Sequence, residues 1–575
     1  GNFDRFKLHS TIAMSSLAGS DDSDHMDRAA LKSALEAVLR SATSDDGEAF
    51  SLNLHSSIIV RKGQSVESTR KKEGSFKEQL QQLTSRLFAV IKNSDKLAEN
   101  KSDPEMTADL FHQLSKNYIE SPVLRVTWLE NLAHFQVSQS SWSEAACAYL
   151  MIASLSASYL TRKGGKSSER VGVPKSDDAM FKAVCAHIAT EPGLPATEQE
   201  GIYDSHLFTR EGFVSSLHNA VGFFLKAQYY ELAVAILGTL STTHLAAHDY
   251  TRLGRVAASQ SRLCSQLTEA NASQARLFAH FYRVGFYGKR WREFNGKQFV
   301  YKADAAQRVS EFSQALLDRF RGKFGEQVQL LAPGQKPDAA MSSAPNVAFV
   351  DVSTVKPDSR GDTPFERQHN VSRFVLEQPF TVGGSKYGSL TEQWKRRTLY
   401  SCSSTFPTVS ARLPVVDVDE KLLSPLVCAV ETVKEKCDAL RAELDAPSPD
   451  LKTLQLILQG SVLLQVNEGP LAIARAFLSS DFNAENNPTA VADTDDVAKN
   501  QSKLRKEFER FVTTLQEGLI LNGQLIGSDQ LPFQHELELG FANTVQELEQ
   551  FKIRAKLQPT STSLPSTPST PHQIN

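Results

Sequence analysis

The sequence has no long hydrophobic run, and its few cysteines follow no metal-binding pattern. No stretch of about 18 uninterrupted apolar residues occurs, so we expect no membrane-spanning helix. The six cysteines include no Cys-x-x-Cys pair, and no histidine cluster at metal-ligand spacing accompanies them. Sparse, unpaired cysteines are typical of a reducing compartment. We therefore expect a cytoplasmic protein with free thiols and no bound metal.

The sequence also lacks an excess of charge of either sign. Its 63 Lys and Arg residues against 66 Asp and Glu residues give a formal net charge of -3. Because nucleic-acid binding favours a basic surface, we expect no nucleic-acid partner. The 575 residues predict three or four structural units. The chain begins Gly-Asn-Phe, without Met or a signal-peptide pattern, and we interpret it as a fragment of a longer protein.

Signatures of known catalytic sites are missing as well. The sequence has no G-x-x-x-x-G-K-S/T loop, no G-x-G-x-x-G, no G-x-S-x-G and no H-E-x-x-H. Gly383–Ser389 contains glycines and a lysine, but a hairpin or surface loop is the better interpretation because no helix pattern follows. The adjacent His535 and Glu536 fit a solvated helix face. We expect no covalent catalysis, no cofactor and no guanine nucleotide bound by the chain itself.

The sequence contains a long helical region that follows a polar N-terminal segment. Residues 1–74 are rich in Ser and Asp and indicate linker or disorder, apart from one possible helix over 27–41. From 75 to 270 the apolar residues recur at helical spacing and predict stacked helix hairpins. The run 142–160 is apolar all round, which suits an inner helix. A break near 227–229 predicts the end of one helix and the start of the next.

The pattern changes after residue 270. Runs rich in β-branched and aromatic residues predict a β-rich lobe of antiparallel strands over 271–420. Helical spacing returns over 421–555 and predicts a bundle, with Ser424 as N-cap of its first helix. Residues 556–575 are rich in Pro, Ser and Thr and predict a disordered tail. Within the β-rich lobe, the expected strands are 298–302, 346–355, 372–380, 396–402 and 409–418, with a helix over 305–320.

One helix of the predicted bundle is interrupted. Its pattern stops at Gly460–Ser461 and a helix restarts at Pro470, with the apolar segment Val-Leu-Leu-Gln-Val-Asn-Glu-Gly between them. Gly469 permits an unusual backbone conformation, and Asn467 tolerates the left-handed region or can cap the new helix. Two interpretations stay open. The segment is either a connection whose apolar side chains plug the bundle, or a rigid apolar finger that serves as a site.

These residues carry a resemblance to a known family. Leu458–Leu478 is very similar to the interrupted helix in the catalytic region of the dedicator-of-cytokinesis (DOCK) exchange factors. The Val-Asn-x-Gly-Pro pattern is closest to the zizimin-like and plant-like branches. Further blocks are similar in the same order, so that the resemblance covers roughly 75–550: Glu144–Leu160, Phe281–Lys302, Phe365–Gly384, Glu392–Val415 and Leu423–Leu444.

The resemblance implies the second DOCK homology region, a mainly α fold with a β-rich middle, in three lobes. The helical lobe 75–270 would mediate homodimerisation, and the middle lobe 271–420, with two antiparallel sheets, would bind a GTPase. The bundle 421–555 would carry the interrupted helix. The implied activity is guanine nucleotide exchange on a Rho-family small GTPase, Rac-like or Cdc-like, in signalling to the cytoskeleton. Any recruitment to membranes would depend on regions outside this sequence.

The resemblance also assigns residues in the insert. The family's insert carries a valine, the nucleotide sensor, which displaces Mg²⁺ from the GTPase. This role maps best onto Val466, in the context of Asn467 and Gly469, and Val462 is the less favoured candidate.

Other interpretations stay open beside the exchange factor. Lys395, Arg396 and Arg397 are candidate contacts for an acidic partner, with a solvated strand end as the alternative. A non-catalytic helical scaffold that binds a small GTPase is the alternative function, and the intact insert favours exchange over it. An undescribed hydrolase is a further alternative, against which the missing nucleophile and base argue.

Overall fold

A computed structural model describes residues 96–554, apart from 98–99, 101–102, 120, 164–171, 176–178, 195–204, 273–275, 277, 333, 336, 360, 362, 382–387, 447–448, 464–468 and 480–493. The expected linker over 1–74, with its helix over 27–41, and the expected tail over 556–575 lie outside these residues. The chain forms two compact units. The first contains the described residues up to Val375 together with Tyr400–Val418, and the second contains Leu376–Leu399 together with those from Asp419 onward.

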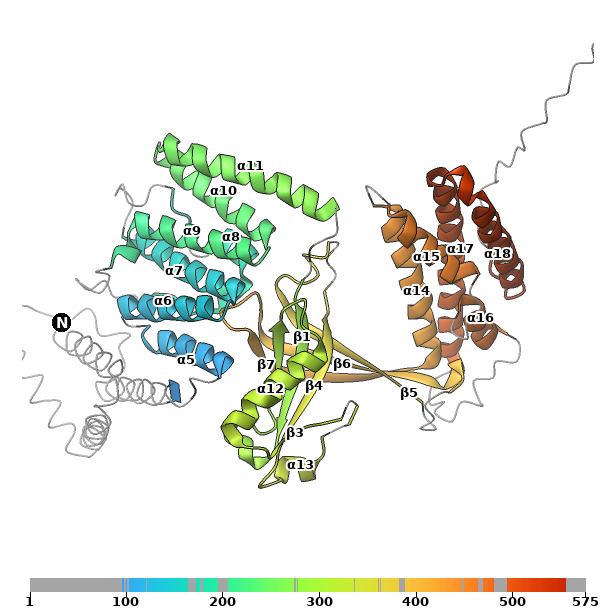
Figure 1. Ribbon diagram of the computed structural model, residues 1–575, viewed down its shortest axis with the longest axis horizontal. Helices are drawn as coiled ribbons and strands as arrows, with labels where there is room; N and C mark the ends of the chain where they lie inside the picture. The colour runs from blue at the N-terminus through green and yellow to red at the C-terminus, as the bar shows by residue number, and fades with distance from the viewer. Residues whose placement is uncertain are drawn as a thin grey trace, which may run out of the picture. The chain divides into compact units, whose positions relative to one another are not determined.

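The first unit begins with layered helices (Figure 1). The break predicted near 227–229 is found, because α9 ends at Lys226 and α10 begins at Tyr230. Helix α7 is buried along nearly its whole length and packs against α6 and α9, as its all-round apolar pattern predicts. The helices are α5 (Pro104–Asn117), α6 (Pro122–Ser138), α7 (Trp142–Arg162), α8 (Ala179–Val184), α9 (Arg210–Lys226), α10 (Tyr230–Ala246) and α11 (Tyr250–Ala272), with the short 3-10 helices η3 (Ala186–Thr190) and η4 (His206–Phe208).

A β-sheet follows the helices, with strands in the order β1-β2-β7-β6-β5-β4-β3. Strand β1 also pairs with β4, so the sheet closes into one ring instead of the two separate sheets that the resemblance implies. Helix α12 (Val309–Phe324) packs its buried Phe312, Leu316 and Phe320 against one face. The strands are β1 (His280–Tyr287), β2 (Gln298–Ala303), β3 (Val328–Leu330), β4 (Ala348–Pro357), β5 (Val371–Thr381), β6 (Gln393–Phe406) and β7 (Arg412–Leu423).

Two of these strands differ from the sequence expectation. Strand β1 was not expected, because it is buried on both faces from Phe281 to Tyr287 and so shows no alternation. Strand β3 pairs with β4 in parallel, whereas only antiparallel pairs were expected. The connection between them carries the short helix α13 (Ala339–Ser343), a crossover of the kind that parallel strands require.

The second unit is built around a helical bundle (Figure 1). Ser424 caps its first helix as expected, because the hydroxyl oxygen accepts a hydrogen bond from the Val427 amide at 3.4 Å. Helix α17 supplies a row of fully buried side chains that includes Phe508, Phe511 and Leu515. No helix among the described residues is long and apolar enough to cross a membrane. The helices are α14 (Pro425–Leu444), α15 (Leu451–Val462), α16 (Pro470–Leu478), α17 (Thr494–Leu525) and α18 (Leu531–Glu549).

Candidate functional site

Helix α15 leads into the interrupted segment and is fixed at both ends. Asp450 caps its start, because the carboxylate accepts hydrogen bonds from the Thr453 amide at 3.1 Å and from its hydroxyl at 2.6 Å. Leu454, Leu458 and Val462 are buried at intervals of four residues and face the bundle core. The helix therefore extends through Val462, beyond the break expected at Gly460–Ser461. Burial of its last apolar turn outweighs the low helix propensity of a glycine and a serine.

Val462, the less favoured sensor candidate, is part of the bundle core. Its exposed fraction is 8%, and it lies in the same apolar cluster as Leu458 and Phe508. The interpretation of the insert as a plug is therefore right for Val462. Leu463, the next residue, is half-buried against the same cluster.

Gly540 of α18 allows the end of α15 to pack this closely. A Cβ atom built on Gly540 would lie 2.8 Å from Leu463 Cδ2 and 3.1 Å from the Val462 carbonyl oxygen. Any larger residue at this position would require the Leu463 side chain to rotate and the Val462 carbonyl to move by a few tenths of an ångström. Sequence reasoning missed Gly540, although a glycine inside a helical pattern costs about 1 kcal/mol relative to alanine and so indicates a packing reason.

Helix α16 restarts the chain after the insert. Its N-cap is Gly469 rather than Asn467, followed by Pro470 in the first turn. Gly469 is buried and has φ −69° and ψ 162°, values that any residue adopts, so the chain does not use the unusual conformation that a glycine permits there. The Gln501 side chain donates a hydrogen bond at 2.8 Å to the Phe477 carbonyl and ties α16 to α17.

The structure thus places both ends of the insert, Leu463 and Gly469, on rigid elements. Val466 and Asn467 lie outside the described residues. Of the two helices that flank the insert, α15 packs against α17 and α18, and α16 packs against α18.

The three expected cations lie on β6 in the second unit, and each pairs with a carboxylate of its own chain. Lys395 Nζ lies 3.2 Å from Glu377 Oε2, and Arg396 Nε lies 2.9 Å from Glu420 Oε1. Arg397 bonds Glu431 of α14 as well as Glu377 of β5. Lys395 and Arg397 thus join β6 to β5 and α14, and Arg396 joins β6 to β7, which differs from the solvated strand end considered above.

The pKa values reflect these pairs. Hydrogen bonds to Glu431 and Glu377 raise the pKa of Arg397 above its usual value. Burial alone would raise the pKa of Glu377, but hydrogen bonds from Arg397 and Lys395 outweigh it and hold the pKa low. Sequence reasoning missed Glu377 and Glu431, because nothing in the linear pattern indicates that β5 and α14 flank the cations.

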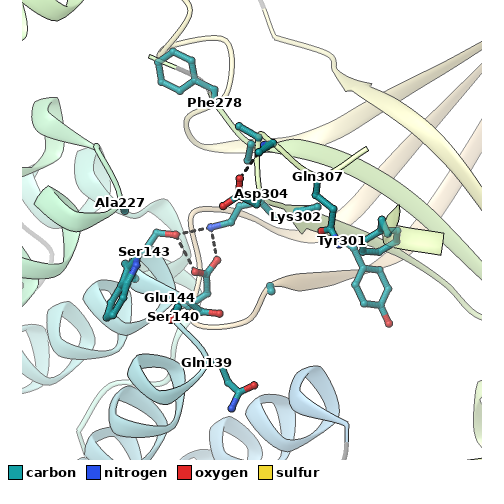
Figure 2. A pocket seen from close by; sticks show the side chains of 18 of the residues that line it. Gln139, Ser140, Ser143, Glu144, Ala227, Phe278, Tyr301, Lys302, Asp304 and Gln307 are labelled. Carbon is teal, nitrogen blue, oxygen red and sulfur yellow. Dashed lines mark hydrogen bonds and ion pairs between the residues drawn. The ribbon is translucent and has the colours of Figure 1, made fainter. Parts of the chain in front are cut away.

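A separate cavity of about 670 Å³ lies in the first unit, between the helices and the sheet (Figure 2). In Figure 2 the Lys302 ammonium points at the Glu144 carboxylate and at the Ser143 hydroxyl. Burial alone would lower the pKa of Lys302, but the Glu144 charge outweighs it and raises the pKa. Lys302 therefore stays protonated near neutral pH and is not a nucleophile.

Comparison with family models assigns three consecutive parts of this chain. Residues 109–269 match the model described as DHR-2, Lobe A. Residues 335–405 match DHR-2, Lobe B, and residues 439–551 match DHR-2, Lobe C. The last match contains the interrupted helix, and the middle match contains the three cations of β6.

Curated relatives extend over most of the chain. Dedicator of cytokinesis protein 9 of Rattus norvegicus is 32% identical over 516 residues, which cover 83% of this chain and 68% of that protein. Dedicator of cytokinesis protein 7 of Homo sapiens is 29% identical over 558 residues, 95% of this chain. Protein 9 of Mus musculus is 33% identical over 500 residues. The chain spans only 24% and 23% of the length of these last two relatives.

Proposed function

The chain belongs to the dedicator-of-cytokinesis family, whose DHR-2 region it contains, and from this membership we propose that it is a guanine nucleotide exchange factor. Its proposed substrate is a Rho-family small GTPase, Rac-like or Cdc-like, from which it accelerates the release of GDP. The observation that carries the proposal is the interrupted helix of the bundle, with a short apolar insert between two anchored helix ends.

Exchange of this kind needs no covalent chemistry in the chain. The factor binds the nucleotide-free GTPase more tightly than the GDP-bound GTPase, and linkage then requires that it weaken GDP by the same ratio. A shift of the GTPase from 1:99 to 99:1 in favour of the nucleotide-free form requires about 5.5 kcal/mol of differential binding.

The insert supplies this difference at the Mg²⁺ ion of the GTPase. Magnesium demands near-ideal octahedral oxygen geometry, and in a GTPase it bridges protein and phosphate. The isopropyl group of Val466, placed at that position, offers no ligand atom and excludes water. The ion then leaves and GDP is held less tightly.

Anchoring of both ends makes such a finger effective. A segment that displaces an ion must be held rigidly. If its base moves instead, part of the binding free energy deforms the exchange factor and no longer weakens the binding of Mg²⁺ and GDP. The contacts of Leu463 with Gly540 and of α16 with Gln501 hold that base in place. The alternative, a scaffold that binds a GTPase without exchange, gives no role to the close α15–α18 packing.

The β6 strand forms part of the proposed GTPase surface as well. Lys395, Arg396 and Arg397 are from 21% to 30% exposed at their side chains. Because their charges are already paired, we assign them a supporting role: they fix the shape of this surface more than they attract the partner.

We also propose a cytoplasmic protein, since Cys147, Cys185 and the other four cysteines are free thiols.

Release of a fluorescent GDP analogue from a panel of Rho-family GTPases tests the proposal. We expect catalytic amounts of the chain to accelerate release from at least one Rac-like or Cdc-like member, and not from a Ras-like control. Binding of a GTPase without acceleration would favour the scaffold.

A further inference from the structure

Three side chains with metal-ligand atoms converge in the first unit, away from every residue assigned above. His112 lies on α5, His187 lies on η3, and Glu191 directly follows η3. Their ligand atoms all lie within 4.8 Å of one another. The side chains of His187 and Glu191 are only 7% and 6% exposed, and that of His112 is 13% exposed. The cluster is therefore nearly closed to bulk water.

The two distances from the histidines to the carboxylate are those of neighbouring ligands around one ion. His112 Nε2 lies 3.3 Å and His187 Nε2 lies 3.1 Å from Glu191 Oε1. Neither pair meets the angular geometry of a good hydrogen bond, so both ring nitrogens are buried without such a partner, while the carboxylate is paired with the Lys116 ammonium. Zinc–ligand bonds of about 2.0–2.1 Å at tetrahedral angles separate neighbouring ligand atoms by about 3.3 Å.

The hydrogen bond of His187 also fits a role as a metal ligand. Its Nδ1 lies 2.7 Å from the Ser404 hydroxyl on β6, also in the first unit. A ligating histidine almost always makes such a hydrogen bond with its other nitrogen, which fixes the tautomer and directs the lone pair of Nε2 at the metal. The two imidazole rings meet at 65° with centroids 5.5 Å apart, close to the value of about 5 Å expected for two rings that share one tetrahedral ion.

We propose that His112, His187 and Glu191 form a zinc site, with a water molecule as the fourth ligand. Two imidazoles and one carboxylate in a closed site suit Zn²⁺ better than Mg²⁺ or Ca²⁺, which prefer oxygen ligands alone. The ion joins α5 to η3 and, through Ser404, to β6. Its role is to fix the helices to the sheet inside the first unit.

Lys116 is the competitor for this site. Its Nζ lies 3.0 Å from Glu191 Oε1, so the Lys116 ammonium occupies a position beside the carboxylate that the zinc ion would take. The Lys116 side chain is 40% exposed and is long enough to turn into solvent. Zinc binding therefore exchanges one cation for another at Glu191, and removal of Lys116 strengthens it.

Titration calorimetry of the chelator-treated chain with zinc chloride tests the proposal without any GTPase, so its outcome is independent of the exchange activity. We expect one zinc ion per chain, at least tenfold weaker binding in His112→Gln and His187→Gln, and tighter binding in Lys116→Ala. His206→Gln, at an exposed histidine of η4, is the matched control and should bind as the wild type does. Cobalt(II) substitution should give the absorption of a tetrahedral ion, which only a built site produces.

His112→Gln is the variant less disposed to misfold, because His112 is the more exposed of the two histidines and glutamine, like a neutral imidazole, carries no charge. Absence of saturable zinc binding would overturn the proposal, and so would binding that persists equally in both histidine variants. The cluster would then be an ion pair of Lys116 with Glu191, flanked by two histidines.

Discussion

At the scale of single residues, we expect two valines four positions apart to have different roles. Val466→Ala should slow GDP release at least tenfold, which corresponds to about 1.4 kcal/mol of lost differential binding. Folding should be nearly unchanged, because the proposed sensor role places the Val466 side chain on the GTPase and not in the core of the bundle. The measurements are release of a fluorescent GDP analogue, GTPase binding and the melting temperature of one variant. Unchanged GDP release by a stable, GTPase-binding variant would remove Val466 as the sensor.

Val462→Ala is the parallel control and should behave in the opposite way. Val462 is 8% exposed in the bundle core, so truncation should lower the free energy of unfolding by roughly 0.5–3 kcal/mol. Exchange should fall only as far as the folded fraction does, which circular dichroism and GDP release measured on one sample can establish.

Glu377 should show a pH-dependent contribution to stability. Its pKa in the folded chain is held below the ordinary value of 4.5 despite burial, so its stabilising effect is present above pH 4.5 and is lost as the pH falls through the folded pKa. Glu377→Gln should therefore destabilise the chain at pH 7, by less than about 1 kcal/mol because the pair is partly exposed. The difference should shrink below pH 4.5 in denaturant titrations. Glu326→Gln, at an 89% exposed side chain, should show no such trend.

At the scale of elements, helical spacing predicted helices, and runs of β-branched and aromatic residues predicted several strands. Strands β2, β4 and β5 and the break between α9 and α10 lie within a few residues of their expected places. Strand β1 could not be found in this way, since Phe281 packs inside the ring against Phe374 and Phe406 while its neighbour Tyr282 packs outside against Phe312. Burial of both faces removes the alternation on which a strand prediction depends.

The end of α15 shows the same limit for the candidate site. Local propensity placed the break at Gly460–Ser461, but tertiary contacts carry the helix on to Val462. Those contacts come from Gly540, which is distant in sequence, so no local pattern could reveal them. The interruption of the helix could be predicted from the sequence, whereas the contacts that hold its two ends could not.

Gly540→Ala should disturb the insert through this contact. An added methyl group would meet Leu463 Cδ2 at 2.8 Å and the Val462 carbonyl oxygen at 3.1 Å, so the Leu463 side chain must rotate or the end of α15 must shift slightly. We expect GDP release to slow several-fold. Alanine in place of glycine inside a helix normally raises the free energy of unfolding by roughly 0.5–1 kcal/mol, and we expect this increase to be absent for Gly540→Ala.

Gly523→Ala is the matched control for this variant. Gly523 lies in α17, where the nearest atom to a new Cβ is Gln534 Nε2 at an ordinary 3.5 Å. The substitution should raise the melting temperature and leave exchange unchanged. Equal stabilisation of both variants, with wild-type exchange, would contradict a positioning role for Gly540.

At the scale of the whole molecule, composition and periodicity predicted a helical region, a β-rich region and a second helical region in the right order. They could not predict that β5, β6 and β7 contribute residues to two compact units, because that grouping depends on packing between distant segments. The cluster of His112, His187 and Glu191 could not be predicted from the sequence for the same reason. Helices α6 and α7 separate its first member from the others along the chain, so their spacing matches no ligand motif.

The chain should bind no guanine nucleotide by itself. Its sequence contains no phosphate-binding loop, so its effect on nucleotide must act through the GTPase. Calorimetric titration with GTP and Mg²⁺ should give no saturable heat, with a nucleotide-free Rho-family GTPase as the positive control. Saturable binding would require a different mechanism.

Homodimerisation through the first helical lobe is the last expectation, and the structure changes the argument for it. The apolar surface of α7 is covered by α6 and α9 of the same chain, so it no longer points to a partner copy. In helix α11, only Val256 and Leu263 are buried among the described side chains up to residue 271, and the helix packs chiefly on α10, so much of its surface is uncovered. Leu245 and Tyr250, at the turn between α10 and α11, are 54% and 64% exposed.

We therefore expect a dimer whose interface includes the outer face of α10 and α11. Light scattering at micromolar concentration should give twice the chain mass of 63.4 kDa. A double variant, Leu245→Glu with Tyr250→Glu, should give a monomer without loss of melting temperature, because obligate interfaces exclude unpaired charge while exposed positions tolerate it. Val309→Glu, at a 41% exposed position of α12, is the control and should remain a dimer. A clean monomer for the wild-type chain at these concentrations would contradict the dimer.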